Sequence, residues 1–196
     1  MIEKCYLHWS ATPYTWKEPG HYHSVVTGDG VVHRLTDYKT ELYEHTYGRN
    51  RNSTSLALAC MGEGGWSDYP PTPAQIDSMC KEVAKIALGL GWEANATFLK
   101  KRVMTHAEAA ANRDCPLELA AQFSNKYPSS SWDHAAQAAG LPHANYGPSS
   151  WSDGWPGGDV FRWDLWQLRP TDKGGAGGFE LRDKIVAWMK KLSKPS

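Results

Sequence analysis

The sequence of 196 residues has no excess of charge of either sign, because 21 lysines and arginines balance 21 aspartates and glutamates. Bulk charge therefore does not draw the protein to nucleic acid or to an anionic membrane. The sequence also lacks an apolar run long enough for a signal peptide or a membrane span. These absences argue against a nucleic-acid partner and against membrane insertion, and they predict synthesis in the cytoplasm without a signal peptide.

A C-x-x-C pair and an internal repeat are also missing. Three of the four cysteines fall in apolar contexts, where a free cysteine acts as a small hydrophobic residue; the four are Cys5, Cys60, Cys80 and Cys115. We interpret them as reduced thiols, and a disulfide is the alternative for a protein that works outside the cytosol. The length fits a single domain over residues 1–196, which can bury a core without metal or disulfides.

Aromatic residues are abundant, with ten tryptophans and nine tyrosines, several of them in stretches rich in glycine, proline and serine. Such rings can stack on sugars while their N–H and O–H groups bind hydroxyls. Anchoring of the core and loops is the ordinary alternative.

Short apolar segments predict strands at residues 4–9, 21–26, 31–35, 55–61 and 102–106. Asp29-Gly30 favours a hairpin turn between the second and third of these. The clearest helix begins after Thr72, with Pro73 at the first helical position and Gln75 completing a capping box. The alternation predicts an α/β fold with a central mixed β-sheet flanked by helices.

The last third of the chain changes character. Residues 112–160 are too long for a structureless loop in a compact domain and predict a functional insertion. Residues 174–178 are mostly glycine and predict a flexible joint, and residues 179–192 predict a C-terminal amphipathic helix.

Two of the eight histidines, His8 and His106, each end an apolar strand, where α/β folds usually place their sites. Taken alone, any of the histidines is more simply interpreted as solvated or hydrogen-bonded, and this holds for His21, His23, His33, His134 and His143.

Six motifs in order add to this interpretation: Leu7-His8-Trp9-Ser10-Ala11-Thr12; Tyr22-His23-Ser24-Val25-Val26 with Gly28-Asp29-Gly30; His45-Thr46-Tyr47-Gly48-Arg49-Asn50 leading into Ser55-Leu56-Ala57-Leu58; Pro71-Thr72-Pro73-Ala74-Gln75; Val103-Met104-Thr105-His106-Ala107-Glu108; and Arg162-Trp163-Asp164. Together they resemble the type-2 N-acetylmuramoyl-L-alanine amidases, which share a fold with phage lysozyme-like amidases and peptidoglycan recognition proteins. The resemblance spans residue 1 to residue 110 and resumes near Arg162.

The resemblance implies one zinc ion held by His8, His106 and Asp164, a set that leaves a fourth tetrahedral position open, as in catalytic zinc sites. Cys115 is the alternative third ligand, because some relatives use cysteine. Asp164 is preferred because relatives carry a basic residue two positions before the third ligand, and Arg162 fits that place.

The resemblance also implies catalytic roles for Tyr22 and Arg162. Arg162 stands where many relatives have lysine and would act only electrostatically, since arginine does not lose its proton near neutral pH; a surface ion pair is the alternative. Ala59 stands where some members of the family have a catalytic glutamate, which the lysozyme-like branch also lacks.

The implied reaction is hydrolysis of the lactyl–L-alanine amide bond of bacterial peptidoglycan, and a non-catalytic peptidoglycan-binding module is the alternative. The expected substrate contacts are His45, Asn50 and Asn52, with Trp151 and Trp155 from the insertion, which would wall the substrate groove. We expect a monomer, either a phage endolysin or a toxin against competing bacteria with an immunity protein as partner. In both cases it would act on muropeptides or intact cell wall after release or export.

Overall fold

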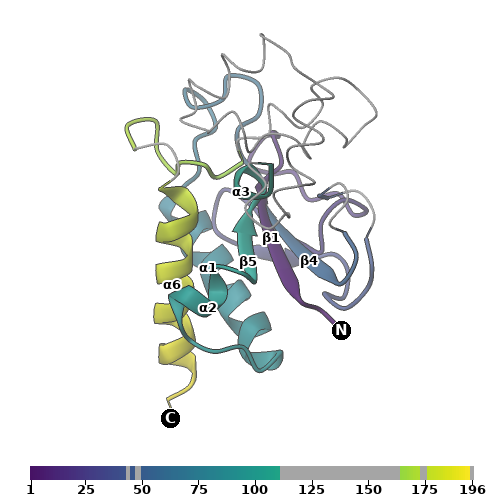
Figure 1. Ribbon diagram of the computed structural model, residues 1–196. Helices are drawn as coiled ribbons and strands as arrows, with labels where there is room; N and C mark the ends of the chain where they lie inside the picture. The colour runs from purple at the N-terminus through teal and green to yellow at the C-terminus, as the bar shows by residue number, and fades with distance from the viewer. Residues whose placement is uncertain (43–44, 47–49, 111–163, 173–175, 195–196) are drawn as a thin grey trace, which may run out of the picture.

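A mixed five-stranded sheet forms the centre of the molecule. The computed structural model describes residues 1–42, 45–46, 50–110, 164–172 and 176–194 (Figure 1). The strands are β1 (Lys4–Trp9), β2 (Ser24–Val26), β3 (Val32–Arg34), β4 (Ser53–Leu58) and β5 (Val103–Thr105), in the sheet order β3-β2-β4-β1-β5. β3 is antiparallel to β2, and the other pairs are parallel. The predicted α/β fold with a central mixed sheet is confirmed.

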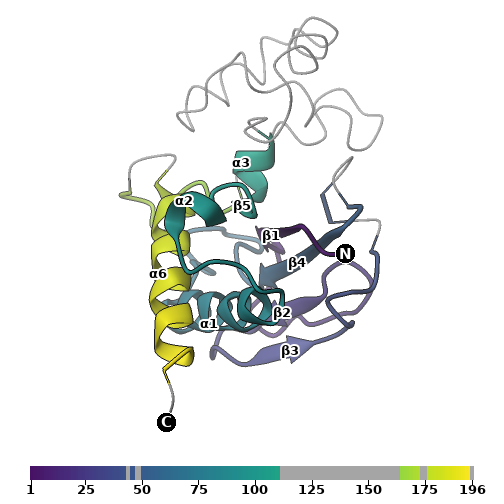
Figure 2. The same cartoon turned by 60° about the horizontal axis from the view of Figure 1, so that its bottom comes forward.

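Two long helices, α1 (Pro73–Gly89) and α6 (Gly177–Leu192), pack against each other beside the sheet (Figure 2). The core between them and the strands is apolar and includes Leu7, Leu56, Met79, Leu181 and Ile185. Two short helices, α2 (Ala96–Leu99) and α3 (His106–Ala110), flank β5 in the chain. None of the helices in these described segments has both the length and the apolar character needed to cross a bilayer.

The start of α1 follows the sequence prediction. The Thr72 hydroxyl accepts from the Gln75 backbone N–H at 3.1 Å, and the Gln75 side chain accepts from the Thr72 N–H at 3.0 Å. The Gln75 amide also donates to the carbonyls of Val26 and Ala59, at 3.0 and 2.9 Å. The capping box therefore ties the helix to the carboxyl ends of β2 and β4.

The predicted hairpin is also present, although both of its strands have only three residues. Its turn closes between Thr27 and Val31, with Gly30 at a φ of +82° that glycine adopts without steric cost. β4 differs from the predicted 55–61 range, because it begins at Ser53 and ends at Leu58. Met61 has a φ of +58°, a left-handed conformation that cannot continue a strand.

The prediction of a flexible joint over residues 174–178 is wrong for Gly177 and Gly178, which form the first turn of α6. A Cβ atom at Gly177 would overlap the carbonyl of Leu165, and one at Gly178 would overlap the carboxylate of Glu108. These glycines are present because two segments approach the helix closely, not because the chain bends there.

Three cysteines, Cys5, Cys60 and Cys80, are buried and carry free thiols, as expected. Burial raises the pKa of the Cys80 thiol to about 12 and also raises the pKa of Cys5 and Cys60. These thiols are therefore protonated and unreactive near neutral pH. Cys115 lies outside the described residues.

Candidate metal centre

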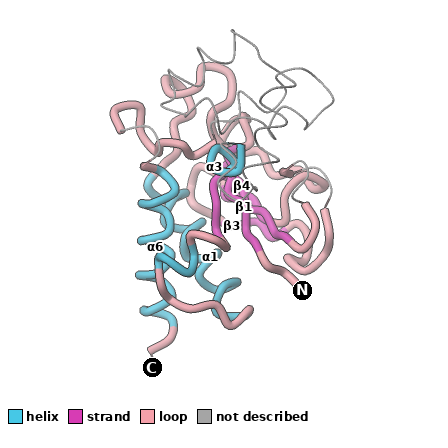
Figure 3. The backbone as a smooth tube through the Cα atoms, viewed as in Figure 1, coloured by secondary structure: helices cyan, strands magenta, loops and turns pink. Residues whose placement is uncertain are grey.

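Two histidines meet at the carboxyl ends of neighbouring parallel strands. β1 pairs with β5 so that Leu7 lies opposite Thr105, and His8 and His106 follow these two residues. His106 is the first residue of α3, directly after β5. Figure 3 shows the short helix α3 at the end of the strands of the sheet. The two Nδ1 atoms are 3.0 Å apart, and the ring centroids are 4.6 Å apart.

Asp164 completes the group from a distant part of the sequence. Its Oδ2 atom lies 3.3 Å from His106 Nδ1 and 3.4 Å from His8 Nδ1. All three residues are buried, with His8 fully inaccessible. A carboxylate and two imidazoles thus direct one donor atom each to a common point.

The spacing of these three atoms fits zinc. Ligands of a tetrahedral zinc ion lie about 2.0–2.1 Å from the metal, which places them about 3.3 Å from one another. The observed separations of 3.0, 3.3 and 3.4 Å agree with this value. Imidazole and carboxylate are also ligands that zinc accepts, and three of them leave one tetrahedral position for water or substrate.

The Asp164 carboxyl group is held in its charged form. Burial alone would raise its pKa, but the interactions with the neighbouring imidazoles, that of His106 first, outweigh burial and lower the pKa below its ordinary value. An ionised carboxylate is the form that binds a metal ion.

The C-terminal helix α6 helps to hold His106 in position, through contacts with the residues on either side of it. The Thr105 hydroxyl accepts from the Glu108 N–H, and the Glu108 carboxylate accepts from the Thr105 N–H, both at 3.1 Å. Arg182 of α6 binds the same carboxylate through two nitrogens, at 2.7 and 2.9 Å, and also donates to the Val103 carbonyl. This buried ion pair clamps the strand-to-helix junction that carries His106.

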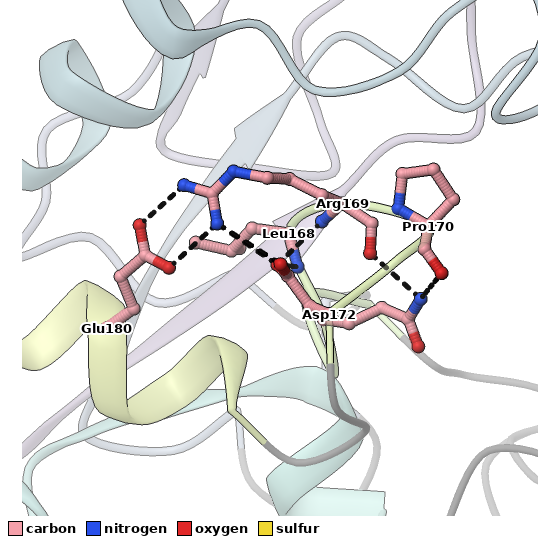
Figure 4. A network of polar contacts seen from close by, with 6 residues as sticks. Leu168, Arg169, Pro170, Asp172 and Glu180 are labelled. Carbon is pink, nitrogen blue, oxygen red and sulfur yellow. Dashed lines mark hydrogen bonds and ion pairs between the residues drawn. The ribbon is translucent and has the colours of Figure 1, made fainter.

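The segment after Asp164 is held against the same helix. The Ala107 N–H donates to the Asp164 carbonyl at 3.3 Å, and the Gly177 N–H donates to the Trp166 carbonyl at 3.1 Å. Figure 4 shows the next turn, where Arg169 reaches both Asp172 and Glu180. The Asp172 carboxylate also accepts the backbone N–H groups of Leu168 and Arg169, which closes the turn.

Two residues predicted to contact substrate, His45 and Asn50, both contact Thr46, whose hydroxyl lies 3.2 Å from His8 Nε2. The His45 ring is 6.0 Å from the His8 ring and only 4% exposed, and its nitrogens contact the hydroxyls of Thr46 and Ser53. Burial, followed by the nearby His8, His23 and His106, lowers the pKa of His45 to about 2. Asn50 accepts the Thr46 N–H with its side chain at 2.7 Å. The described contacts of both residues are therefore internal.

The other residue of that group, Asn52, lies at the opposite end of β1 from His8. Its carbonyl accepts the N–H groups of Glu3 and Lys4, and its φ of 55° is left-handed. The structure therefore does not bring Asn52 to the metal centre.

His23 has a structural environment. Its Nδ1 accepts the Ser55 N–H at 3.0 Å, and its Nε2 donates to the Thr40 carbonyl at 2.7 Å. Because a backbone N–H can only donate and a carbonyl can only accept, His23 is neutral with its proton on Nε2. Burial lowers its pKa, which agrees with this assignment.

Tyr22 is placed beside the cluster. Its ring centroid is 5.0 Å from that of His8, and the residue is partly exposed. Trp16 also packs against the Tyr22 ring, with centroids 6.1 Å apart. Tyr22 is thus a partly exposed residue whose ring contacts the buried His8.

The other predicted site residues, Arg162, Trp151 and Trp155, lie outside the described residues, as does the alternative ligand Cys115. The predictions for them stand on the sequence alone.

Three residues of the site received no role from the sequence: Thr46, Glu108 and Arg182. The spacing of Thr105 and Glu108 is that of a capping box, which could have identified Glu108. Thr46 and Arg182 have no comparable local signal, because each contacts a partner far away in the chain.

Comparison with known families identifies a related family. A sequence model described as N-acetylmuramoyl-L-alanine amidase matches residues 3–118. The matched range includes His8, Tyr22 and His106, and it ends before Asp164. No curated protein matches the chain.

Proposed function

Because the chain belongs to the N-acetylmuramoyl-L-alanine amidase family, we propose that it is a zinc-dependent enzyme that hydrolyses the amide bond between the lactyl group and L-alanine in bacterial peptidoglycan. The observation that carries this proposal is the buried set of His8, His106 and Asp164, whose donor atoms lie 3.0 to 3.4 Å apart. This spacing fits a single zinc ion with an open position.

The residues of the chain divide the work of this reaction. His8 and His106 would supply ring nitrogens, and Asp164 an ionised carboxylate, to hold zinc. Zinc in such a site polarises the amide carbonyl and activates water as a nucleophile. Hydrolysis leaves a carboxylate on the lactyl group and a free amine on the peptide.

Charge that develops on the carbonyl oxygen needs additional stabilisation. Tyr22 lies beside His8 and can donate its phenolic proton in a hydrogen bond to that oxygen. Arg162, two residues before Asp164 in the sequence, would add a positive charge without giving up a proton.

The complete ligand set supports an enzyme over a non-catalytic peptidoglycan-binding module. Ala59 stands where some relatives have a catalytic glutamate, and because its side chain is a buried methyl group, this position supplies no acid. The reaction is therefore proposed to rely on the metal and on Tyr22 rather than on a glutamate at the end of the central strand.

The biological setting that we propose is a phage endolysin or an interbacterial toxin. Such a protein would be made in the cytoplasm, act on the cell wall after release or export, and work as a monomer. An immunity protein would be its partner in the second case. Trp151 and Trp155 are the proposed contacts to polymeric substrate from the insertion.

Two measurements on the purified protein test the proposal. Incubation with purified peptidoglycan should release free amino groups on L-alanine, and a chelator should abolish that release. Zinc should be found at about one ion per chain. Binding to peptidoglycan without any release of amine from the zinc-loaded protein would favour the recognition module, and full hydrolysis by a metal-free sample would contradict the zinc mechanism.

A further inference from the structure

A chain of buried polar groups runs from His8 to a backbone carbonyl. His8 Nε2 is 3.2 Å from Thr46 Oγ1, which is 3.0 Å from His45 Nδ1. His45 Nε2 is 3.3 Å from Ser53 Oγ, and Ser53 donates to the Asn50 carbonyl at 2.7 Å. All four side chains are at most 4% exposed. We call this series the buried chain.

The carbonyl at its end determines the direction of every hydrogen bond. A carbonyl oxygen only accepts, so the single hydroxyl hydrogen of Ser53 is used on Asn50. Ser53 Oγ must then accept from His45 Nε2–H, which leaves His45 Nδ1 with a lone pair. That lone pair accepts the hydroxyl hydrogen of Thr46.

The last step reaches the metal centre. Since the Thr46 hydrogen is used on His45, Thr46 Oγ1 accepts from His8 Nε2–H. A neutral His8 with its proton on Nε2 has a lone pair on Nδ1, the atom that lies 3.0 Å from His106 and 3.4 Å from Asp164. The reverse direction would place the proton of His8 on Nδ1 and block coordination.

We infer that the buried chain selects the tautomer of His8 that offers Nδ1 to the metal, and that Thr46 is a positioning residue for this purpose. The inference rests on the proposed zinc function. Asn50 contributes twice, because its side chain also binds the Thr46 N–H and so keeps the hydroxyl in place. The groups that hydrogen-bond a ligating histidine usually change metal affinity by about 10-fold to 100-fold when removed.

The sequence offers a matched control within one strand. Ser53 and Ser55 lie two residues apart on β4, both are buried, and the hydroxyl of each lies within hydrogen-bonding distance of a histidine. Ser55 contacts His23, whose tautomer is already determined by backbone groups and which has no place in the buried chain. Ser55→Ala thus removes a similar hydroxyl without touching the path to His8.

The first readout is zinc affinity, measured by competition with a chromophoric chelator. Thr46→Val should bind zinc about 10-fold to 100-fold more weakly than the native protein, and Ser53→Ala should be weakened in the same direction. Thr46→Ser, which keeps the hydroxyl, should recover most of the affinity, and Ser55→Ala should match the native protein. Native affinity in Thr46→Val would overturn the inference.

The second readout is independent of activity. In the metal-free protein at alkaline pH, ¹⁵N–¹H correlation spectra of the imidazole rings distinguish the protonated nitrogen of His8 from the nitrogen with the lone pair. The native protein and Thr46→Ser should show the proton on Nε2, and Thr46→Val should show a mixture. A single unchanged tautomer in Thr46→Val would contradict the inference, whereas absence of zinc binding with the expected native tautomer would contradict the proposed function alone.

Discussion

The two faces of the sheet differ in chemistry although they share the same strands. One face presents Cys5, Leu7, Leu56 and Leu58 to the core under α1 and α6. The other presents Tyr6 and His8 from the same strand β1, with His45 packed against both rings. We call the first the apolar face and the second the histidine face.

The difference shows that stability and chemistry are separated across one layer of backbone. Burial of apolar area contributes roughly 25 cal/mol per Å², so the apolar face supplies stability without polar partners. Polar groups buried on the histidine face are costly unless they are hydrogen-bonded, and the described ones there form connected networks. Substitutions on the apolar face should therefore mainly lower stability, whereas substitutions on the histidine face should mainly affect metal binding and activity.

The largest effect is expected from His8→Ala on the histidine face. This change removes a metal ligand and should reduce bound zinc and amide hydrolysis to background while the helical circular dichroism is retained, because the apolar face is intact. His143→Ala, in the predicted insertion, should leave zinc content and rate nearly unchanged. Retention of both properties in His8→Ala would mean that the centre lies elsewhere.

The next largest effect on zinc binding is expected from Asp164→Ala. Loss of the carboxylate leaves two histidines, and zinc should bind much more weakly in a titration followed by elemental analysis. Cys115→Ser tests the alternative ligand and should keep native zinc content. The opposite result, in which the cysteine variant loses zinc and the aspartate variant keeps it, would overturn the ligand assignment and the role proposed for Arg162.

Arg182 connects the two faces of the sheet. It belongs to helix α6, which covers the apolar face, and it binds Glu108, two residues after His106. Arg182→Met leaves a buried carboxylate unpaired and should lower the free energy of unfolding by about 3–5 kcal/mol. The neighbouring variant Leu181→Ala should cost about 2–5 kcal/mol through a cavity in the apolar core. Denaturant unfolding measures both, and only Arg182→Met should also weaken zinc binding. Equal zinc affinities would show that the clamp does not position His106.

The smallest effect near neutral pH comes from the titration of His45. His45 has a folded-state pKa of about 2 because of burial and the neighbouring histidines, against an ordinary value of 6.5. Between these values the unfolded chain binds one more proton, so the stability of the metal-free protein should fall as pH decreases below 6.5, by up to about 1.4 kcal/mol per pH unit. Above that pH, His45 contributes no slope. His45→Gln should make the dependence shallower by one proton, and an unchanged slope would show that His45 titrates normally.

The sequence predicted those elements that depend on local signals. The capping box at Thr72 and Gln75 placed the start of α1 correctly, and the turn at Asp29-Gly30 placed the hairpin. His8 and His106 were recognised because both follow apolar strands and because the ordered motifs resemble one family. The family match confirms that resemblance.

What the sequence did not predict depends on contacts between distant segments. Thr46 reaches His8 across 38 positions, and Arg182 reaches Glu108 across 74. Gly177 and Gly178 were interpreted as a flexible joint because glycine disfavours helices in isolation, but close packing against Leu165 and Glu108 outweighs that propensity. Likewise, His45 contacts Tyr6 and His8 of β1 only in the folded protein, so the sequence alone did not indicate that this histidine is buried.

X-ray absorption spectroscopy of the zinc-loaded protein tests the central claim most directly, because it reports the ligand atoms of the metal. The account predicts a first shell of nitrogen and oxygen alone at about 2.0–2.2 Å, with multiple scattering from two imidazole rings. This result is the one expected for zinc held by His8, His106 and Asp164, and the spectrum should be lost in Asp164→Ala. A scatterer at about 2.3 Å would be sulfur, which only a thiolate such as that of Cys115 could supply, and it would contradict the account.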